Sequence, residues 1–466
     1  EQIMEYLMGK DNFGISSKYD GDLAYRIVVV RYAMLGNRFA RYKEVKIATD
    51  VSDKTVAYVN EHMDTLSGIS VNEDMIRKYN YSEYFSSIIG YTGPISESEY
   101  TALHKKNKDY TQNDTVGKAG LEQYYETYLR GKNGEQKFYI DNVGRISEII
   151  SSTDSVAGDD LYLSIDADLQ KATYLALQNE IAAIVYSNIK SGEIPINDVY
   201  TALIGNSVIN TEHFSKAKAS DTEKNVLSVF KSRQKTTLGK IKQELTSSPE
   251  ALNTMSDEVL DEFTYIISML KDDQVLLKNE IDTSDSVYQK WKNQKISPKE
   301  YLSYCITQHW IDISQLNVDE KYADSTEVYD ALCKYILKNI KTDTEFSKII
   351  YQYMITRGEI SPRQLCLILF DQGVLDYDDA TVNKLKNGSL SPRDFLMKKI
   401  YNIEITPAQL ALEPCTGSCV VTDEKTGEIR AMVSYPGYDS NKLANGVDSE
   451  YFASLQHDKS FPLLNY

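Results

Sequence analysis

The spacing of apolar residues changes along the chain and divides it into three regions. In the first region, up to about residue 170, helix-like and strand-like spacings both occur. Residues 19–36, YDGDLAYRIVVVRYAMLG, have a helical apolar period that ends at Gly36, which predicts an amphipathic helix. Residues 43–49, KEVKIAT, alternate between apolar and polar, which predicts a strand.

Further short elements follow in the first region. Ser52 is a predicted N-cap for a helix over 53–62, and SESEYTAL (96–103) predicts another helix start. SGISV (67–71) and MIRKYN (75–80) predict two short strands. Short strands broken by short helices are typical of an α+β module.

The second region, from about residue 170 to 412, loses its strand signals and gains repeated helix starts. A Ser or Thr hydroxyl accepts a hydrogen bond from the free first-turn N–H groups, and Pro fits the first helical position. Such starts occur at Ser248-Pro249, Ser297-Pro298, Ser361-Pro362, Ser391-Pro392 and Thr406-Pro407. Their irregular spacing does not indicate a solenoid, so we predict a bundle of roughly ten helices.

The third region, 413–466, returns to strand-like runs. GSCVVTD (417–423) and GEIRAMVSYP (427–436) flank residues 423–427, a short loop that contains Gly427. Two such runs around a five-residue loop predict a β-hairpin. The predicted fold class is therefore α+β, with domains at 1–180, 181–412 and 413–466.

Composition and charge narrow the possible functions. The net charge is −17 and 42% of residues are hydrophobic, as in a soluble globular protein. A phosphate-tracking surface needs clustered cations, so no nucleic-acid partner is expected. No apolar run approaches the roughly 18 residues that cross a bilayer. The chain opens without Met, so we expect it to be a piece of a longer protein.

The cysteines predict neither a disulfide framework nor a metal site. There are five, an odd number, and they are widely spaced. Cys415 and Cys419, or Cys305 and His309, would each need further ligands to hold zinc. Packing of Cys305 in a core is the better interpretation, and we expect no metal and no cofactor.

One segment resembles a known family. Residues 117–134, GKAGLEQYYETYLRGKNG, are similar to a segment of class B penicillin-binding proteins, the membrane-anchored peptidoglycan transpeptidases of bacterial division and elongation. Four more segments resemble that family in the same order: 86–100, 158–177, 417–445 and 460–466. The family pattern falls on Gly117, Gly120, Leu121, Glu122, Tyr125, Leu129, Arg130, Gly131 and Gly134.

The same segment also has a purely structural interpretation. Gly117 and Gly120 permit a close approach of the backbone at a helix start, and Gly131 is a plausible helix C-cap. Glu122, Glu126 and Arg130 follow an i, i+4 spacing along one helix face. We expect this segment to be structural rather than catalytic.

The resemblance implies a domain arrangement and a function. Residues 1–180 would be a pedestal of the dimerisation type, 181–412 a helical insertion, and 413–466 the start of a truncated transpeptidase domain. The parent protein would cross-link stem peptides through a serine acyl-enzyme and react with β-lactams. The pedestal would contact a SEDS-family glycosyltransferase, and a single-pass anchor upstream would hold the protein on the extracellular face of the plasma membrane. The alternative is a scaffold without catalysis that binds cell-wall synthesis or division partners.

The family's catalytic motifs are not assigned to any residue of this chain. Lys425-Thr426-Gly427 spells the family's substrate-binding Lys-Thr-Gly, but it precedes the place of the catalytic Ser-x-x-Lys, so we interpret it as a hairpin turn. We expect the nucleophile just beyond Tyr466. Ser70-Val71-Asn72 lies in the first region. Ser-x-x-Lys also occurs, as solvated helix faces, at Ser187/Lys190, Ser215/Lys218, Ser228/Lys231, Ser232/Lys235 and Ser268/Lys271.

Overall fold

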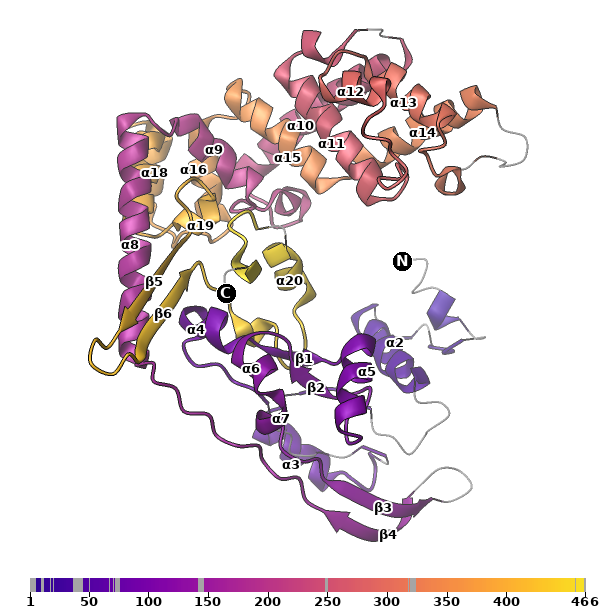
Figure 1. Ribbon diagram of the computed structural model, residues 1–466, viewed down its shortest axis with the longest axis vertical. Coiled ribbons are helices and arrows are strands. Elements are labelled where there is room, and N and C mark those ends of the chain that lie inside the picture. The colour runs from indigo at the N-terminus through magenta and orange to yellow at the C-terminus, as the bar shows by residue number, and fades with distance from the viewer. Residues whose placement is uncertain are drawn as a thin grey trace. The chain divides into compact units, whose positions relative to one another are not determined.

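The computed structural model, shown in Figure 1, describes most of the chain. The described residues are 6–9, 12–16, 18–19, 21–36, 45–49, 51–66, 68–69, 71, 76–140, 146–247, 250–316, 318, 324–456 and 458–464. They form two units, and each unit draws on separate stretches of sequence. The first unit comprises Glu1–Asn80, Ile88–Leu163 and Asp439–Asp448, and the second comprises Tyr81–Ser87, Ser164–Tyr438 and Ser449–Tyr466.

The first unit combines short helices with two antiparallel strand pairs, as an α+β module does. Strand β1 pairs with β2, with Thr92 opposite Gly117, and β3 pairs with β4 in a longer ribbon (Figure 1). Its elements are α2 (Gly21–Gly36), α3 (Asp53–Glu61), β1 (Thr92–Pro94), α5 (Glu97–Lys106), β2 (Thr115–Gly117), α6 (Gly120–Tyr124), α7 (Glu126–Leu129), β3 (Glu135–Ile140), β4 (Ile146–Thr153) and η4 (Ser440–Lys442).

The second unit is mainly helical and also holds one hairpin. Its first stretch, Tyr81–Ser87, holds most of α4 (Ser82–Ile89). The other elements are α8 (Ala167–Ser191), α9 (Ile196–Gly205), η1 (Thr211–Ser215), α10 (Asp221–Thr246), η2 (Leu252–Thr254), α11 (Asp257–Asp272), α12 (Ser286–Lys292), α13 (Pro298–Thr307), η3 (Ile313–Gln315), α14 (Ser325–Ile340), α15 (Thr344–Thr356), α16 (Pro362–Asp371), α17 (Asp379–Asn387), α18 (Pro392–Tyr401), α19 (Pro407–Leu410), β5 (Gly417–Thr422), β6 (Ile429–Tyr435), α20 (Ser449–Gln456) and η5 (Pro462–Leu464).

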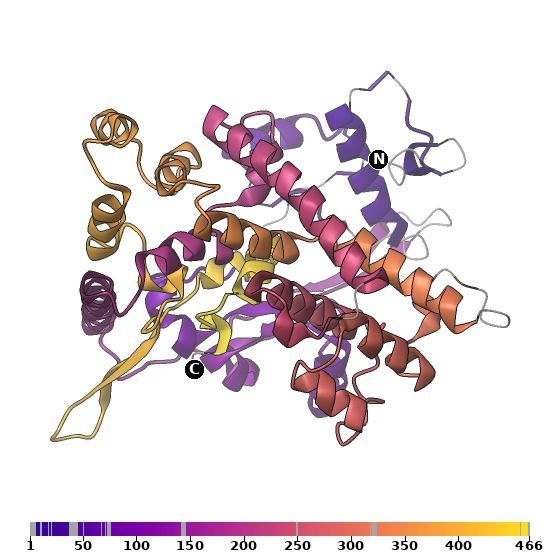
Figure 2. The ribbon, with the colours of Figure 1, turned by 90° about the horizontal axis from the view of Figure 1, so that it is seen from above.

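Helix α8 belongs to two hydrophobic cores. Its first part packs beside the β5–β6 hairpin, where Tyr174 and Ile181 join Val433 and Tyr435 in a small cluster (Figure 1). Its last part, including Val185, contributes to the large helical core. Figure 2 shows the same helix end-on. The expected boundary at 180/181 falls within this continuous helix, and the three-domain division stays a prediction.

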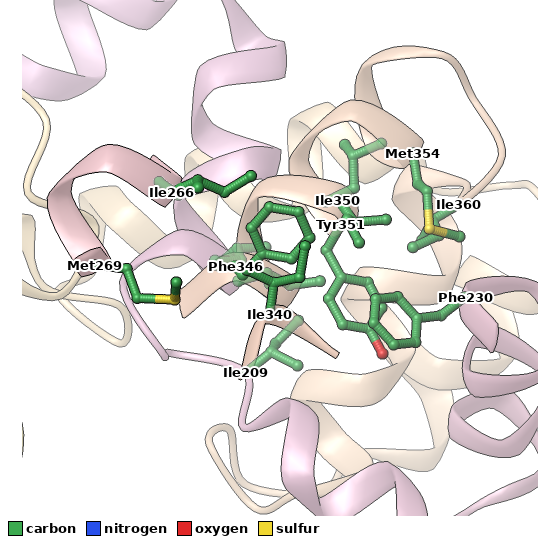
Figure 3. Packing of buried hydrophobic residues seen from close by; sticks show 14 of the residues in the cluster. Ile209, Phe230, Ile266, Met269, Ile340, Phe346, Ile350, Tyr351, Met354 and Ile360 are labelled. Carbon is green, nitrogen blue, oxygen red and sulfur yellow. The ribbon is translucent and has the colours of Figure 1, made fainter. Parts of the chain in front are cut away.

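The large core is built from aliphatic and aromatic side chains of the helices α8 to α19. Phe230 and Tyr351 stack with their ring centroids 4.2 Å apart, and Phe346 and Ile350 lie beside them (Figure 3). Phe346 and Ile350 have no exposed surface. Burying such side chains removes apolar area from water, which is the main favourable contribution to folding.

The predicted Ser/Thr-Pro helix starts are confirmed wherever the structure describes them. Ser297, Ser361, Ser391 and Thr406 are N-caps whose side chains accept a first-turn N–H, and Pro follows at the first helical position. Ser248-Pro249 lies outside the described residues. The helix over 21–36 is confirmed, and Ser52 and Ser96 are the N-caps of α3 and α5.

The ends of the helices repeat more regularly than their starts. Left-handed residues occur at Gly358, Gly373, Gly388 and Ile403, a constant spacing along the chain. Each is followed two residues later by Ile or Leu, and the next helix begins soon afterwards. A left-handed residue with a following apolar contact is a common way to end a helix. The irregular spacing of the Pro residues therefore concealed a regular repeat over this stretch.

Three predicted strands are not strands in their described residues. Residues 45–49, 68–69, 71 and 76–80 form no strand. At Arg77 and Tyr79 the backbone N–H groups donate to side-chain amides of Asn445 and Asn441, so they do not pair with another strand.

Among the helices that the structure describes, none combines the length and apolarity needed to cross a bilayer.

Candidate functional site

The Lys-Thr-Gly sequence forms the turn of the β5–β6 hairpin, as expected. The Asp423 carboxylate accepts hydrogen bonds from the backbone N–H groups of Lys425 at 2.8 Å and Thr426 at 3.1 Å. These two bonds lower the pKa of Asp423. Gly427 closes the turn with a φ of 76°. The side chains of Lys425 and Thr426 are exposed, so this turn does not form an enclosed substrate site.

The five early Ser-x-x-Lys pairs are placed where solvated helix faces were expected. All five serines are exposed, and Lys271 is the one lysine of these pairs that is half-buried. The pairs lie on α8, α10 and α11 and at the end of η1. Ser70-Val71-Asn72 is only partly covered, because Ser70 and Asn72 lie outside the described residues.

The segment 117–134 contains two buried carboxylates. Glu122 in α6 and Glu126 in α7 are 5% and 8% exposed. Glu122 forms an ion pair with Arg77, with Nε and Oε1 2.9 Å apart, and also accepts the hydroxyl of Tyr79 at 3.3 Å. A buried charge is stable only when it is paired and hydrogen-bonded, and Arg77 supplies that compensation.

Glu126 has a different set of partners. Its carboxylate accepts the backbone N–H of Gly117 at 2.8 Å and the hydroxyl of Tyr110 at 3.2 Å. Burial raises the pKa of Glu126, and the two hydrogen bonds oppose that rise. Burial also raises the pKa of Tyr110 to about 12, so the phenol stays protonated as a donor at neutral pH.

The expected i, i+4 pairing along this segment needs a correction. The helix breaks at Tyr125, between α6 and α7, and Glu122 and Glu126 bind partners elsewhere in the first unit. Arg130 pairs with Asp114 at 2.5 Å. Glu122, Glu126 and Arg130 were predicted to interact with one another along one helix face. They instead lie on the buried side of the segment and bind other residues.

The glycines of the segment allow backbone segments to approach one another, as predicted. A Cβ on Gly117 would lie 2.1 Å from the backbone carbonyl of Glu122, and one on Gly120 would lie 2.4 Å from the carbonyl oxygen of Ile88. Gly120 also has a φ of 58°. Gly131, which follows α7, has a φ of 72°, which confirms its role at the helix end.

A returning stretch of chain completes the first unit, and sequence reasoning missed it. The Asn441 side chain accepts the N–H of Tyr79 at 2.8 Å and donates to its carbonyl at 3.0 Å. Asn445 binds the N–H and carbonyl of Arg77 in the same way, at 3.0 and 2.6 Å. The i, i+4 spacing of these Asn residues in NKLAN was the available signal, but it did not indicate a partner.

In the second unit a buried amide has a similar role. Gln170 of α8 has no exposed surface. Its side chain accepts the N–H of Met432 in β6 and donates to the carbonyls of Met432 and Tyr84, each at 2.8 Å. Gln170 thus adds hydrogen bonds to the apolar packing that holds the hairpin against α8.

The cysteines lie apart from any ligand cluster in the described residues. Cys305 is fully buried, and burial raises the pKa of its thiol to about 12, which is typical of core packing. No group of three or more His, Cys, Asp or Glu residues within the described ranges could hold a metal ion.

Comparison with known proteins matches the first third of the chain. Residues 3–163 match the model of the penicillin-binding protein dimerisation domain. Penicillin-binding protein 2A of Bacillus subtilis is 35% identical over 136 residues, which cover 29% of this chain and 19% of that protein. Peptidoglycan D,D-transpeptidase MrdA of Salmonella typhimurium is 29% identical over 157 residues, which cover 33% of this chain and 25% of that protein.

A solved structure gives a weaker likeness. Penicillin-binding protein 2B of Streptococcus pneumoniae matches with a TM-score of 0.24 and 24% identity, over 37% of this chain and 27% of that one. The chain spans a quarter or less of the length of the curated relatives named above. The sequence matches confirm the resemblance to class B penicillin-binding proteins.

Proposed function

We propose that this chain, whose first third matches a penicillin-binding protein dimerisation domain, is part of a peptidoglycan D,D-transpeptidase. The similar proteins from Salmonella typhimurium and Bacillus subtilis carry the names of a D,D-transpeptidase and a penicillin-binding protein. The parent protein would form a serine acyl-enzyme with a stem peptide and pass the acyl group to a neighbouring stem amine. β-Lactams would acylate the same serine.

One observation carries this proposal beyond the matched domain. Residues 441–445 resemble the start of the family's catalytic domain, and their two Asn side chains pair with Arg77 and Tyr79 inside the first unit. The guanidinium of Arg77 in turn binds the buried Glu122. Two segments that resemble the family therefore bind the same short stretch at Arg77 and Tyr79.

The finer parts of the proposal concern partners and location. The parent protein would be held on the extracellular face of the plasma membrane by a single-pass anchor. Its pedestal would contact a SEDS-family glycosyltransferase. We further propose that residues 181–412 are a helical insertion, and we assign no catalytic residue, metal or cofactor to this chain.

Labelling with a fluorescent penicillin tests the function. We expect the complete parent protein to form a covalent adduct that survives a denaturing gel, and a Ser→Ala change in its Ser-x-x-Lys motif to abolish it. The 466-residue chain alone should give no stoichiometric band. Labelling of this chain at any of the five early serines would contradict the assignment. A parent protein without Ser-x-x-Lys and without labelling would support a binding scaffold instead.

A further inference from the structure

A pocket of about 340 Å³ lies in the helical region, where two helices begin beside a third. It is formed by the starts of α16 and α18 and by Tyr200 of α9, and the three helices lie in one part of the second unit (Figure 1). It is lined by Tyr200, Ser361, Pro362, Arg363, Ser391, Pro392 and Arg393. The same tripeptide, Ser-Pro-Arg, thus contributes to the pocket twice.

Each Ser-Pro-Arg start leaves one backbone donor without a partner. Ser361 accepts the N–H of Gln364 at 3.3 Å, and Ser391 accepts that of Asp394 at 3.1 Å. Pro has no N–H at the first helical position. Among the described residues no hydrogen bond is made by the N–H of Arg363 or Arg393. The partial positive charge of a helix start favours an anion at such donors.

The two arginine side chains are not neutralised by carboxylates. Within the described part of the chain, Arg363 makes no ion pair and no side-chain hydrogen bond. Its guanidinium lies against Gly388, where a Cβ would be 3.2 Å from the nearest nitrogen. Arg393 donates to the carbonyl of Ile189 at 3.3 Å and to no other acceptor in the part of the chain that the structure describes. The nearby Asp394 carboxylate accepts the Ser391 hydroxyl at 2.7 Å and does not line the pocket.

Tyr200 supplies an independent indication of a ligand. The residue is only 5% exposed, yet it lines the pocket, and its hydroxyl has no hydrogen-bond partner among the described residues. The hydroxyl oxygen itself is not fully buried, so it can donate to a ligand in the pocket. Burial raises the pKa of Tyr200 to about 12, so the phenol remains a donor at neutral pH.

We propose that this pocket binds a phosphoryl group through Arg363, Arg393, the hydroxyl of Tyr200 and the two helix starts. One guanidinium satisfies both oxygens of a carboxylate, whereas donors from three helices match the larger number of oxygens on phosphate. The net charge of −17 does not attract anions to the chain in general, so binding would depend on this local arrangement. The site is independent of the proposed transpeptidase function.

Calorimetric titration of the full 466-residue chain with inorganic phosphate tests the proposal. At pH 7 and constant ionic strength we expect saturable binding with one phosphate per chain. Arg363→Gln and Tyr200→Phe should each weaken it, the first by about tenfold, because a charged hydrogen bond is lost. Within the described ranges neither side chain makes a hydrogen bond or an ion pair, so both variants should keep the wild-type melting temperature in the absence of phosphate.

A matched control is available at another helix start. Lys299 occupies the same position in Ser297-Pro298-Lys299 at the start of α13, but it lines no part of the pocket. Lys299→Gln should bind phosphate as the wild type does. Equal weakening by Lys299→Gln and Arg363→Gln would show a general charge effect and overturn the proposal, as would the absence of saturable binding to the wild type.

Further ligands identify the chemistry. Glycerol phosphate and dimethyl phosphate separate a monoester from a diester source, and binding of either supports the phosphoryl assignment. Acetate at the same ionic strength should bind at least about tenfold more weakly than phosphate. Acetate binding as tight as phosphate binding would overturn the assignment. If Arg363→Gln fails to fold, Tyr200→Phe decides between a site and a structural residue.

Discussion

The first unit and the helical part of the second unit achieve their packing by different means. In the first unit, a Cβ at Gly117, Gly120 or Gly131 would lie within 2.4 Å of backbone atoms. In the helical region, Gly239 and Gly373 have nothing within 4 Å of such a Cβ. One region depends on close backbone approach at fixed positions, and the other on a pattern of apolar side chains and caps.

This difference suggests why similarity to known proteins ends where it does. A position that admits only glycine fixes the residue, whereas a core position accepts several apolar residues of similar volume. The family match covers 3–163, the part of the chain that contains these closely approached glycines. The helical region can keep its fold with many different sequences.

Cutting the shared helix should have the largest effect. Because the large helical core runs from Val185 in α8 to Leu410 in α19, we expect residues 164–412 to fold alone as a helical, cooperatively melting protein. Residues 185–405 lose the first part of α8 and should melt at a lower temperature. Circular dichroism during heating measures both fragments. A coil-like spectrum of the longer fragment would show that the helical region depends on other parts of the chain.

Gly117→Ala should severely destabilise the first unit. The added Cβ would lie 2.1 Å from the backbone of Glu122, and the free energy of unfolding should fall by more than about 4 kcal/mol. Gly239→Ala, on an exposed turn of α10, is the matched control and should stabilise that helix by up to about 1 kcal/mol. Urea denaturation of the full chain compares the two. Equal effects would remove the contrast between the regions.

Removing a guanidinium should cost more in the first unit than in the helical region. Arg77→Met leaves buried Glu122 without its cation, and we expect a loss of about 2–3 kcal/mol. Glu258 is equally buried but binds both Arg233 and Arg357. Arg233→Met should therefore cost about half as much. The midpoints of urea unfolding distinguish them, and a greater loss with Arg233→Met would contradict this reasoning.

A buried acid in the helical region should make stability depend on pH. Burial, and secondarily the charge of Glu258, raises the pKa of Glu262 to about 8, whereas the unfolded residue titrates near 4.5. Between these values the folded state retains a proton that the unfolded state has lost, so stability falls as pH rises.

Glu262→Met removes that dependence and should stabilise the chain by about 2 kcal/mol at pH 8. Thermal melts from pH 5 to pH 8 measure the change. Glu193→Met, at an exposed position, is the control and should leave the pH dependence unchanged. A wild-type melting temperature that rises between pH 5 and 8, with no effect of Glu262→Met, would be inconsistent with the raised pKa.

Lys425→Ala should have the smallest effect. The side chain is exposed on the hairpin turn, and the backbone N–H that binds Asp423 remains. The free energy of unfolding should change by no more than about 0.5 kcal/mol. Asp423→Ala removes the acceptor of the two turn hydrogen bonds and should destabilise the chain more than Lys425→Ala does. A large loss of penicillin labelling in a Lys425→Ala parent protein with an intact fold would show a catalytic role for this lysine.

Local signals in the sequence predicted local structure well. Ser361-Pro362 and Ser391-Pro392 carry the cap and the first helical residue in adjacent positions, and both predictions are confirmed. The β3–β4 ribbon was missed because both of its faces are largely exposed, so no apolar alternation marks it. The repeated helix ends were missed because Ile403 and other residues without glycine's freedom also adopt left-handed conformations.

Long-range partners could not be predicted from one sequence. The spacing of Glu122 and Glu126 indicated a shared face, but Arg77 and Tyr110 are separated from them along the chain. Likewise the pocket lined by Arg363 and Arg393 is also lined by Tyr200, which comes from a helix far away in the sequence. Periodicity describes which side of an element is buried and does not identify what lies against it.

The amide pairs at Asn441 and Asn445 have a consequence for chain entropy. They join residues 362 and 368 positions apart, so they close a loop that contains the whole helical region. The entropy of closing a loop grows only with the logarithm of its length, about 0.6 kcal/mol for each doubling. If the helical region were half as long or twice as long, the free energy of closing the loop would change by less than the net contribution of one ordinary hydrogen bond. The first unit therefore places almost no thermodynamic limit on the length of the chain inserted between its second stretch, which ends at Leu163, and its third, which begins at Asp439.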